Sequence, residues 1–460
     1  MVKKNTSNTM IREAYKTLFK NGYTFYKTYS FLKKSQWWSD EEIHTYQLER
    51  LQELISHAYV NVPYYTQLFD DIGLKPEDLQ SFEDLKKIPY LTKQIVQENI
   101  EQLKAKNYPP EAFQYVSTGG STGIPMGFYL EEGVSNAKER AFIKTMWDKV
   151  GYRFIDRCVY LRGSIVKNAN KGEFWEYSML NRWLIMSSYH MTDENLPAYI
   201  KKIREFKPKF FQAYPSAITI LARYMKEHNI SPFSSVKAIL CGSENLYPSQ
   251  RELIEDVFKC RVYSWYGHSE QAVLGGECEH NTSYHLFPEY GYTELIDESG
   301  NPVKEEDGVG EIVVTGFNNS IFPFIRYRTM DLGVLTHERC KCGRKYSLLK
   351  RVEGRLQELI VTKDNRLISM VAINMHSDIF KNVKQFQFYQ EEKGEVTLNI
   401  VPNQNYSEND SEIIKDELSK KLGDGVNLTL NFVENIPRTR SGKYRFLIQK
   451  LSINNFSESF

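Results

Sequence analysis

The central part of the chain alternates between short apolar runs and helical patterns. The apolar runs fall at residues 158–161, 210–213, 236–240 and 261–264, and the helical patterns at residues 194–206, 216–228 and 249–258. Strands that alternate with helices of this length form a parallel sheet that is covered by helices. The sequence therefore predicts an α/β fold here, with further strands at residues 311–315 and 332–335.

The segments on either side of this region have different sequence patterns. Residues 40–110 read as helices interrupted by Pro63, Pro76 and Pro89, so a helical N-terminal segment is expected over residues 1–110. Near the other end, an acidic, Asn-rich stretch at residues 403–412 precedes a predicted helix at 411–422 and a predicted strand at 426–433. We therefore predict a large N-terminal α/β domain over residues 1–355 and a small α+β C-terminal domain over residues 356–460.

Composition excludes several classes of protein. The 460 residues carry 59 Lys and Arg against 58 Asp and Glu, so the net charge of +1 provides no field that would attract nucleic acid. No run of 18 apolar residues indicates a transmembrane segment, and the N-terminus lacks the pattern of a secretory signal. Six cysteines are too few for a disulfide scaffold, so the expected compartment is the cytoplasm.

The N-terminal segment differs in composition from the rest of the chain. Residues 1–38 hold eight Lys and Arg against a single acid, and Ile11, Tyr15, Leu18 and Phe19 are spaced for one helical face. A basic amphipathic helix can make weak contact with an anionic membrane surface. The alternative is a helix that packs its apolar stripe on its own domain, which is the more frequent case.

A stretch rich in hydroxyls and glycine lies at residues 116–125. Its central residues are Ser117, Thr118, Gly119, Gly120, Ser121, Thr122 and Gly123. Glycine lets backbone N–H groups point toward one centre and hydroxyls add donors, which suits a phosphate chain. The spacing matches neither a Walker A loop nor the dinucleotide fingerprint. A flexible Ser/Gly linker is the alternative, but the flanks on both sides look like strands.

Cysteine and histidine residues form a second candidate site. Cys340 and Cys342 lie 62 and 64 residues after Cys278, and two histidines, His280 and His285, follow Cys278 closely. Three thiolates and one imidazole make a closed tetrahedral zinc site, which would be structural because no coordination position stays open. The predicted ligands are Cys278, His285, Cys340 and Cys342, with His280 as the alternative to His285. The alternative is that these four side chains bind no metal and that the cysteines are simply reduced.

Several further motifs follow the hydroxyl–glycine loop in order. They are Cys241-Gly-Ser-Glu-Asn, Trp265-Tyr-Gly-His-Ser-Glu, Ile325-Arg-Tyr-Arg-Thr-Met-Asp-Leu, Arg351-Val-Glu-Gly-Arg and Ile436-Pro-Arg-Thr-Arg-Ser-Gly-Lys-Tyr-Arg. This ordered set resembles the adenylate-forming (AMP-binding) superfamily. Within it, residues 65–69, 85–93 and 212–216 resemble the phenylacetate–CoA ligase branch, and the nearest likeness is to its relatives named for capsular polysaccharide biosynthesis (CapK-type proteins).

The resemblance implies an AMP-forming acid ligase whose small C-terminal domain is mobile. It would use ATP and Mg²⁺ to convert a carboxylic acid to acyl-AMP, releasing pyrophosphate. The acyl group would then pass to CoA or to an amine or hydroxyl acceptor, for which a surface sugar is one candidate. Two other hypotheses stay open: an adenylyltransferase that places AMP on a coenzyme hydroxyl, and a non-catalytic, zinc-stabilised scaffold.

The resemblance also implies a role for individual residues. The loop 117–123 would hold the β- and γ-phosphates, Glu270 would bind Mg²⁺, and Lys443 would stabilise the transition state of adenylation. The remaining nucleotide contacts would come from Gly242, Ser243, Glu244, Tyr266, Gly267, Asp331 and Arg355, and the acid pocket from His190, Tyr214, Ser216 and His268.

Three positions depart from the family's pattern. Met126 replaces a lysine after the loop, Met330 replaces a glycine before Asp331, and Gln357 replaces a hinge aspartate. These departures are the only support in the sequence for the scaffold hypothesis.

Overall fold

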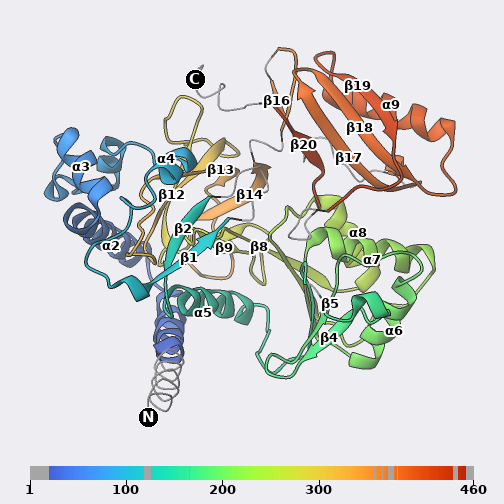
Figure 1. The fold of residues 1–460 in the computed structure, drawn as a ribbon, viewed down its shortest axis with the longest axis horizontal. Coiled ribbons are helices and arrows are strands. Elements are labelled where there is room, and N and C mark those ends of the chain that lie inside the picture. Colours follow the sequence, from blue (N-terminus) through green and yellow to red (C-terminus); the bar gives the residue numbers. More distant parts are fainter. Residues whose placement is uncertain are drawn as a thin grey trace, which may run out of the picture. The chain divides into compact units, whose positions relative to one another are not determined.

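The computed structural model describes residues 20–118, 126–164, 166–355, 359–364, 366–370, 378–380, 382–438 and 444–451. The chain divides into two compact units (Figure 1). The first comprises residues 1–151, 266–329 and 335–350, and the second comprises residues 152–265, 330–334 and 351–460. The domain boundary expected at residue 355 stays a prediction.

The second unit contains the predicted parallel sheet. Its strands run in the order β4 (Trp175–Ser178), β5 (Trp183–Met186), β3 (Cys158–Leu161), β6 (Phe210–Ala213), β7 (Ala238–Gly242) and β8 (Arg261–Gly267). All neighbours pair in parallel except β4, which is antiparallel to β5. The connecting helices are α6 (Leu196–Phe206), α7 (Pro215–Glu227) and α8 (Pro248–Phe258), so the predicted α/β fold is confirmed.

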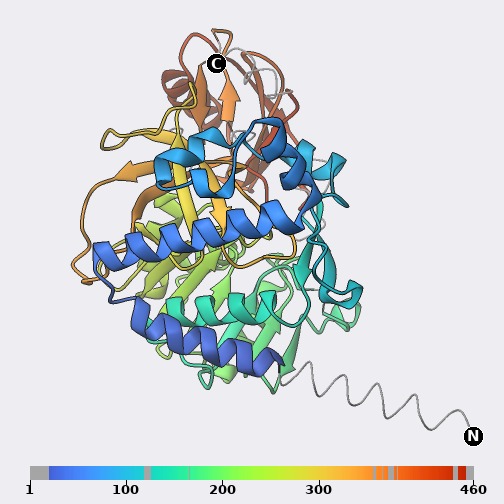
Figure 2. The same ribbon diagram turned by 90° about the vertical axis from the view of Figure 1, so that its left-hand side faces the viewer.

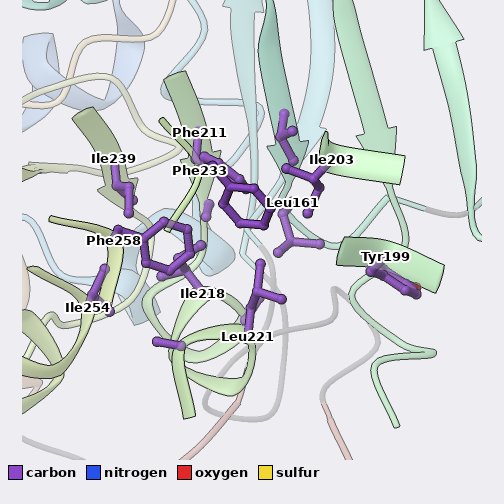
Figure 3. Packing of buried hydrophobic residues seen from close by; sticks show 14 of the residues in the cluster. Leu161, Tyr199, Ile203, Phe211, Ile218, Leu221, Phe233, Ile239, Ile254 and Phe258 are labelled. Atoms are coloured by element: carbon purple, nitrogen blue, oxygen red, sulfur yellow. The ribbon is translucent and has the colours of Figure 1, made fainter. Parts of the chain in front are cut away.

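The core of this sheet region lies between its strands and these helices. Phe211 on β6 packs edge-on against Phe258 of α8, with their ring centroids 5.6 Å apart, and both belong to a cluster of buried side chains (Figure 3). Ile218 and Leu221 of α7 enter the same cluster and are fully buried. Burial of this kind stabilises a fold by roughly 1.5–3 kcal/mol for each large apolar side chain.

The C-terminal part of the second unit is a small α+β arrangement. Four strands run in the order β19 (Asn427–Phe432), β18 (Glu395–Pro402), β17 (Val383–Glu392) and β20 (Leu447–Gln449), and a two-stranded pair is formed by β15 (Leu359–Val361) and β16 (Leu367–Ser369). Helix α9 (Glu408–Leu422) buries Ile414 and Leu418 in a core shared with Phe386, Phe388 and Leu398. The helix predicted at 411–422 and the strand predicted at 426–433 are confirmed.

Helices dominate the start of the first unit. After α2 (Asp40–Asn61), which Ser39 and Glu42 cap reciprocally at its N-terminus, come α3 (Pro63–Asp71) and α4 (Lys93–Glu98). Short 3₁₀ turns lie at Pro76–Asp78, Phe82–Lys87 and Pro110–Ala112. The sequence-based expectation of a helical N-terminal segment is therefore met over the described residues.

Residues 20–38 form the described part of the basic N-terminal segment, and residues 20–35 are helical. The Tyr29 hydroxyl donates to Asp148 of α5 (Ser135–Asp148), and Lys20 pairs with Glu131 at 3.4 Å. Figure 2 shows this helix, in dark blue, alongside α5, in teal. Packing on its own unit, the commoner alternative, accounts for these residues; Ile11, Tyr15, Leu18 and Phe19 lie outside the described part.

The strands of the first unit are mostly antiparallel. A hairpin joins β1 (Phe113–Ser117) to β2 (Gly127–Glu131), β11 (Gly291–Ile296) pairs with β12 (Val309–Gly316), and β10 (Tyr284–Leu286) pairs with β9 (Leu274–Gly276) and β14 (Leu348–Arg355). Strand β13 (Tyr327–Thr336) contains the predicted strand 332–335. Within the described residues, no helix combines the length and the apolar character that a membrane crossing requires.

Candidate functional site

The hydroxyl–glycine loop connects the two strands of the β1–β2 hairpin. Its described ends are tied together: the Thr118 N–H donates to the Met126 carbonyl at 2.9 Å, and the Met126 N–H donates to Thr118 Oγ1 at 3.0 Å. Ser117 precedes this closure and is exposed. The residues from Gly119 to Gly123 lie outside the described part, so their role as a phosphate cradle stays a prediction.

Met126 occupies the position where the superfamily commonly has a lysine. Its side chain is fully buried, and its sulfur lies 3.7 Å from the Tyr327 hydroxyl oxygen. A lysine here would place an ammonium in a fully buried site, where a charge is costly unless it is paired. This chain therefore uses the position for packing.

Glu270 and His268 lie together in the first unit. His268 Nδ1 is 3.0 Å from Glu270 Oε2, and the Tyr327 hydroxyl donates to Glu270 Oε1 at 3.2 Å. The side chains of His268 and Glu270 are only 8% and 10% exposed. The Tyr327 hydroxyl therefore orients the carboxylate that is predicted to bind Mg²⁺, and the His268 ring lies within ion-pair distance of it. The predicted nucleotide residues Tyr266 and Gly267 end strand β8 just before this pair.

The predicted zinc ligands converge in the first unit. One ligand atom from each of Cys278, His285, Cys340 and Cys342 lies within 4.8 Å of all the others. The sulfurs of Cys278 and Cys340 are 3.5 Å apart, and Cys342 Sγ is 3.4 Å from His285 Nε2. Sulfurs bound to one tetrahedral zinc at ~2.3 Å are about 3.8 Å apart, so the donor set fits that metal closely.

The surroundings of the cluster select His285 rather than His280. His285 is fully buried, and its Nδ1 donates to the Ser283 carbonyl at 3.2 Å, which leaves Nε2 facing the thiols. His280 is exposed and contributes its backbone N–H to Cys278 Sγ at 3.3 Å. The geometry therefore favours the first of the two alternatives that the sequence left open.

The charge state of the cysteines also suits a cation. Burial opposes ionisation of Cys342, but hydrogen bonds from His285 and Arg344 outweigh it and lower the pKa of this thiol to about 5. Burial and the neighbouring Cys278 sulfur raise the pKa of Cys340 instead. Three thiolates repel one another without a cation, and a bound divalent metal removes that repulsion.

In the second unit, predicted site residues gather where β6 and β7 end. Tyr214 and Ser216 follow β6, while Ser243 and Glu244 follow β7. The carboxyl ends of parallel strands are the usual place for ligands in such sheets. Ser216 Oγ and N–H both donate to the Glu244 carboxylate, at 3.1 and 3.0 Å, so this carboxylate has protein partners.

Two features fix the backbone around Ser243. A Cβ on Gly242 would come within 2.1 Å of Trp265 Nε1, so the glycine is required for the indole to pack there. Ser243 has φ 67°, a left-handed conformation that is unusual outside glycine and often marks a functional site. Its hydroxyl accepts a hydrogen bond from Arg162 Nη2 at 2.5 Å.

The remaining predicted residues are more scattered. His190 Nδ1 shares a hydrogen bond with Ser187 Oγ at 2.8 Å, and its ring stacks on Phe174, so its visible contacts are structural. Asp331 lies on β13 and is 7% exposed. Arg355 ends β14, and nothing is described of its side chain. Lys443 and Gln357 lie outside the described residues, so these roles stay predictions.

The backbone conformation at Met330 bears on one departure from the family's pattern, the replacement of a glycine by methionine. Its φ of 64° lies in the left-handed region, which costs an ordinary residue on the order of 1 kcal/mol. Glycine, which the family has here, adopts this conformation freely. The chain has kept the backbone turn before Asp331 while accepting the strain of a side chain.

Sequence reasoning missed three residues that contact Ser243, Ser216 or Glu244. Arg162 follows the last residue of β3, where a polar residue at the end of a parallel strand is itself a signal. Arg438 donates to Ser216 Oγ at 3.2 Å, and the Tyr444 N–H donates to Glu244 Oε1 at 3.0 Å. Arg438 and Ser216 are 222 positions apart in the sequence, and Tyr444 and Glu244 are 200 positions apart. No local sequence pattern connects residues at such separations.

Comparisons with known families cover both parts of the chain. Residues 118–321 match the family "AMP-binding enzyme", and residues 360–450 match "CapK C-terminal domain". The second match includes β17, β18, α9, β19 and β20. It also contains the position of Lys443.

Curated relatives extend the likeness over most of the chain. CapK of Staphylococcus aureus is 27% identical over 415 residues, covering 88% of this chain and 89% of that protein. A phenylacetate–coenzyme A ligase of Thermus thermophilus is 24% identical over 443 residues, covering 88% of this chain and 96% of that enzyme.

Solved structures show the same fold. A 2-hydroxyisobutyryl-CoA ligase in the postadenylation state superposes with a TM-score of 0.71 at 20% identity, covering 93% of this chain and 96% of that one. The order of motifs, the two family matches and these relatives agree with one another. The chain therefore belongs to the adenylate-forming superfamily, in its phenylacetate–CoA ligase-like branch near CapK, and is an AMP-forming acid ligase of that branch.

Proposed function

We propose that the chain activates a carboxylic acid with ATP to form acyl-AMP and pyrophosphate, and then transfers the acyl group to CoA. The supporting observation is that the AMP-binding and CapK C-terminal matches follow one another along a single chain. Together they include Thr118, Glu270 and Lys443, which carry the three chemical tasks of phosphate binding, metal binding and charge stabilisation.

In this proposal the chain positions ATP and stabilises charge, because phosphoryl transfer needs little covalent help from protein. Residues of the 117–123 loop bind the terminal phosphates, and the backbone of Gly242–Glu244 meets the adenine, with Tyr266 on its face. Asp331 accepts from the ribose hydroxyls with support from Arg355. Lys443 neutralises the charge that builds on the α-phosphate as the carboxylate attacks.

The metals have candidate ligands of suitable chemistry. Glu270 offers a hard carboxylate oxygen that accepts a hydrogen bond from Tyr327 and lies close to His268, and Mg²⁺ is often bound through one carboxylate together with substrate phosphates. When bound, Mg²⁺ would offset phosphate charge. Cys278, His285, Cys340 and Cys342 would hold a structural zinc ion in the first unit.

The identity of the molecule that accepts the acyl group is also part of this proposal. CoA is supported by the phenylacetate–CoA ligase relatives. The likeness to CapK supports a second acceptor class, an amine or hydroxyl on a sugar used in surface polysaccharide biosynthesis. Both would receive the acyl group from the same acyl-AMP.

The test is acid-dependent exchange of pyrophosphate into ATP across a broad panel of carboxylic acids, with and without CoA. Exchange that requires an acid, followed by an acyl-CoA product in mass analysis when CoA is present, is the expected result. Absence of exchange with every acid, together with absence of ATP binding, would reject the proposal. A stable adenylylated coenzyme would indicate the adenylyltransferase alternative.

A further inference from the structure

Arg162 lies at the carboxyl end of the parallel sheet in the second unit. It follows β3, and the Tyr214 N–H donates to the Leu161 carbonyl at 3.1 Å, so β3 and β6 end side by side. The register of β7 and β8 pairs Gly242 with Trp265. The residues at the ends of these four strands therefore share one edge of the sheet, which is the usual place for a ligand in such folds.

Three aromatic rings lie around the guanidinium of Arg162. Its Cζ atom is 5.9 Å from the ring centroid of Tyr160, 5.6 Å from that of Tyr214 and 5.5 Å from that of Trp265. Aromatic faces attract a cation and take up none of its N–H groups as hydrogen-bond donors. Arg162 is only partly buried, as are Tyr160 and Trp265, so a dissolved ligand can reach the group.

The hydrogen bonds of Arg162 leave its charge without a counter-charge in the described part of the chain. Nη2 donates to Ser243 Oγ, while the buried Nε has no acceptor among the described residues. The carboxylate of Glu244 accepts instead from the N–H and the hydroxyl of Ser216. No acidic side chain of the described residues forms an ion pair with Arg162. Since a partly buried charge is costly without a partner, this arrangement suits an anion that a ligand supplies.

The chemistry of the proposed reaction indicates which anion fits. Adenine is uncharged at neutral pH, so a guanidinium beside it would meet no charge. The reacting carboxylate loses its charge as acyl-AMP forms, and paired hydrogen bonds from a guanidinium would stabilise it more before the reaction than in the transition state. A group that does not react keeps its charge throughout. The forked guanidinium of arginine binds the oxygens of such a carboxylate or phosphate through parallel hydrogen bonds.

We propose that Arg162 is a specificity-determining residue that binds a second, non-reacting anionic group on the acid substrate, either a carboxylate or a phosphate. This deepens the proposed function and rests on it. The substrate class becomes an acid with an additional negative group, in place of a simple hydrophobic acid. The Ser243 hydroxyl orients the guanidinium, and Tyr214, which is expected in the acid pocket, lies beside the bound group.

The first experiment measures binding and does not depend on turnover. The full chain is titrated calorimetrically with pairs of acids that share a skeleton: succinate with butyrate, phthalate with benzoate, and 3-phosphoglycerate with glycerate. In at least one pair, the member with the additional anionic group should bind about 10- to 100-fold more tightly, the range for hydrogen bonds to a charged group. The carboxylate and phosphate pairs distinguish the two sources of that charge. Equal affinities within every pair would overturn the proposal.

Variants test whether Arg162 causes that preference. Arg162→Gln removes the charge and should bring the two members of the preferred pair within about threefold of each other. Arg157→Gln is the matched control and should keep the preference, because Arg157 precedes the same strand, is exposed and donates to the Phe206 carbonyl at 3.0 Å. If Arg162→Gln does not fold, as judged by circular dichroism, Arg162→Lys takes its place. Its ammonium cannot make the two parallel hydrogen bonds, so the preference should fall at least about threefold. A preference equal to the wild type in the variant used would overturn the proposal.

The second experiment separates binding of the acid from binding of the nucleotide. In acid-dependent pyrophosphate exchange, Arg162→Gln should raise KM for the preferred acid about 10- to 100-fold, while KM for ATP changes less than about twofold. The value of kcat should fall less than KM rises, because the bound group does not take part in the reaction. A rise in KM for ATP alone would assign Arg162 to the nucleotide and overturn the proposal.

The outcomes distinguish this inference from the proposed function. Exchange that is supported by the acids with one anionic group as well as by their partners would uphold the proposed function and overturn the role of Arg162. Absence of exchange with every acid, together with absence of ATP binding, would reject the proposed function. The calorimetric preference, and its loss in Arg162→Gln, would then still decide whether Arg162 binds an anion.

Discussion

Two polar clusters hold loops in this protein, and they do so by different chemistry. In the first unit, Cys278, His285, Cys340 and Cys342 converge as soft donors, with the sulfurs of Cys278 and Cys340 3.5 Å apart. In the second unit, the carboxylate of Glu244 receives three hydrogen bonds, from Ser216 and from the backbone of Tyr444. One cluster suits a metal ion, and the other is made of hydrogen bonds alone.

The difference matters because the two chemistries differ in strength. A structural zinc ion contributes roughly 10–16 kcal/mol of binding free energy to folding. A hydrogen bond to a charged group contributes only about 1.5–3 kcal/mol. The predictions below test this contrast, from the largest expected effect to the smallest.

Loss of a zinc ligand should have the largest effect. Cys342→Ser removes a thiol whose pKa is lowered to about 5 and should lower the free energy of unfolding by at least about 5 kcal/mol, with loss of the metal. Zinc per chain, measured by elemental analysis, and thermal unfolding are the readouts. His285→Asn should behave in the same way, while His280→Asn should keep one zinc per chain. Retention of zinc in Cys342→Ser, or its absence from the wild type, would contradict the assignment.

Loss of Lys443, the lysine proposed to stabilise the transition state, should abolish most of the adenylation. We expect Lys443→Ala to reduce kcat for pyrophosphate exchange by about 100- to 1,000-fold, because one donor to the developing charge is lost. ATP binding, measured by calorimetry, should be largely retained. Lys450→Ala removes an exposed lysine from the same region and serves as the control. An equal loss of binding and exchange would assign Lys443 to ground-state binding instead.

A second buried carboxylate, Glu139, sharpens the contrast with Glu244. Glu139 on α5 accepts a hydrogen bond from Tyr290, and burial raises its pKa from the ordinary 4.5 to about 7. The folded state therefore bears a cost that is absent below pH 4.5, grows between pH 4.5 and 7 and is complete above that, on the order of 3 kcal/mol.

Glu139→Gln removes this ionisation while keeping an acceptor for Tyr290. The variant should be more stable than the wild type at pH 8 and nearly equal to it at pH 5, as measured by chemical denaturation at both values. The exposed Glu132→Gln should show no such dependence. A difference that does not change with pH would mean that the carboxyl of Glu139 is not desolvated as described.

The smallest effect is expected from a surface ion pair of the second unit. Lys384 on β17 is 3.0 Å from Asp193, and both side chains are more than half exposed. Such pairs contribute about 0–1 kcal/mol. Lys384→Ala should therefore change the free energy of unfolding by no more than about 1 kcal/mol, as measured by chemical denaturation. A larger loss would mean that Lys384 contributes more to the folded state than an exposed ion pair can.

Much of the fold could be predicted from local pattern. The runs 158–161 and 210–213 coincide with β3 and β6, because strands in the middle of a parallel sheet are continuously apolar. The edge hairpin of β4 and β5 was not predicted, since Trp175–Ser178 alternates aromatic and polar residues and is mostly solvent-facing. The three-residue strand β9, which contains two glycines, also gave no usable signal.

The candidate sites were predicted less evenly. Cysteine and histidine spacing identified the metal cluster, but only burial in β10 and the Ser283 carbonyl distinguish His285 from His280. Met126 was expected to mean a missing charge, and its contact with Tyr327 supplies the packing reason. The backbone at Glu244 was placed in the nucleotide site, while the partners of its side chain could not be foreseen.

The sequence by itself determined the alternation of strands and helices, the order of the motifs and the set of possible metal ligands. These are local properties, because the period of apolar residues and the spacing of ligands can be recognised within a few tens of sequence positions. Only the tertiary structure decided which polar groups meet. Glu244, Ser216 and Tyr444 become neighbours after the chain has folded, and a buried carboxylate takes its partners from whatever the fold brings to it.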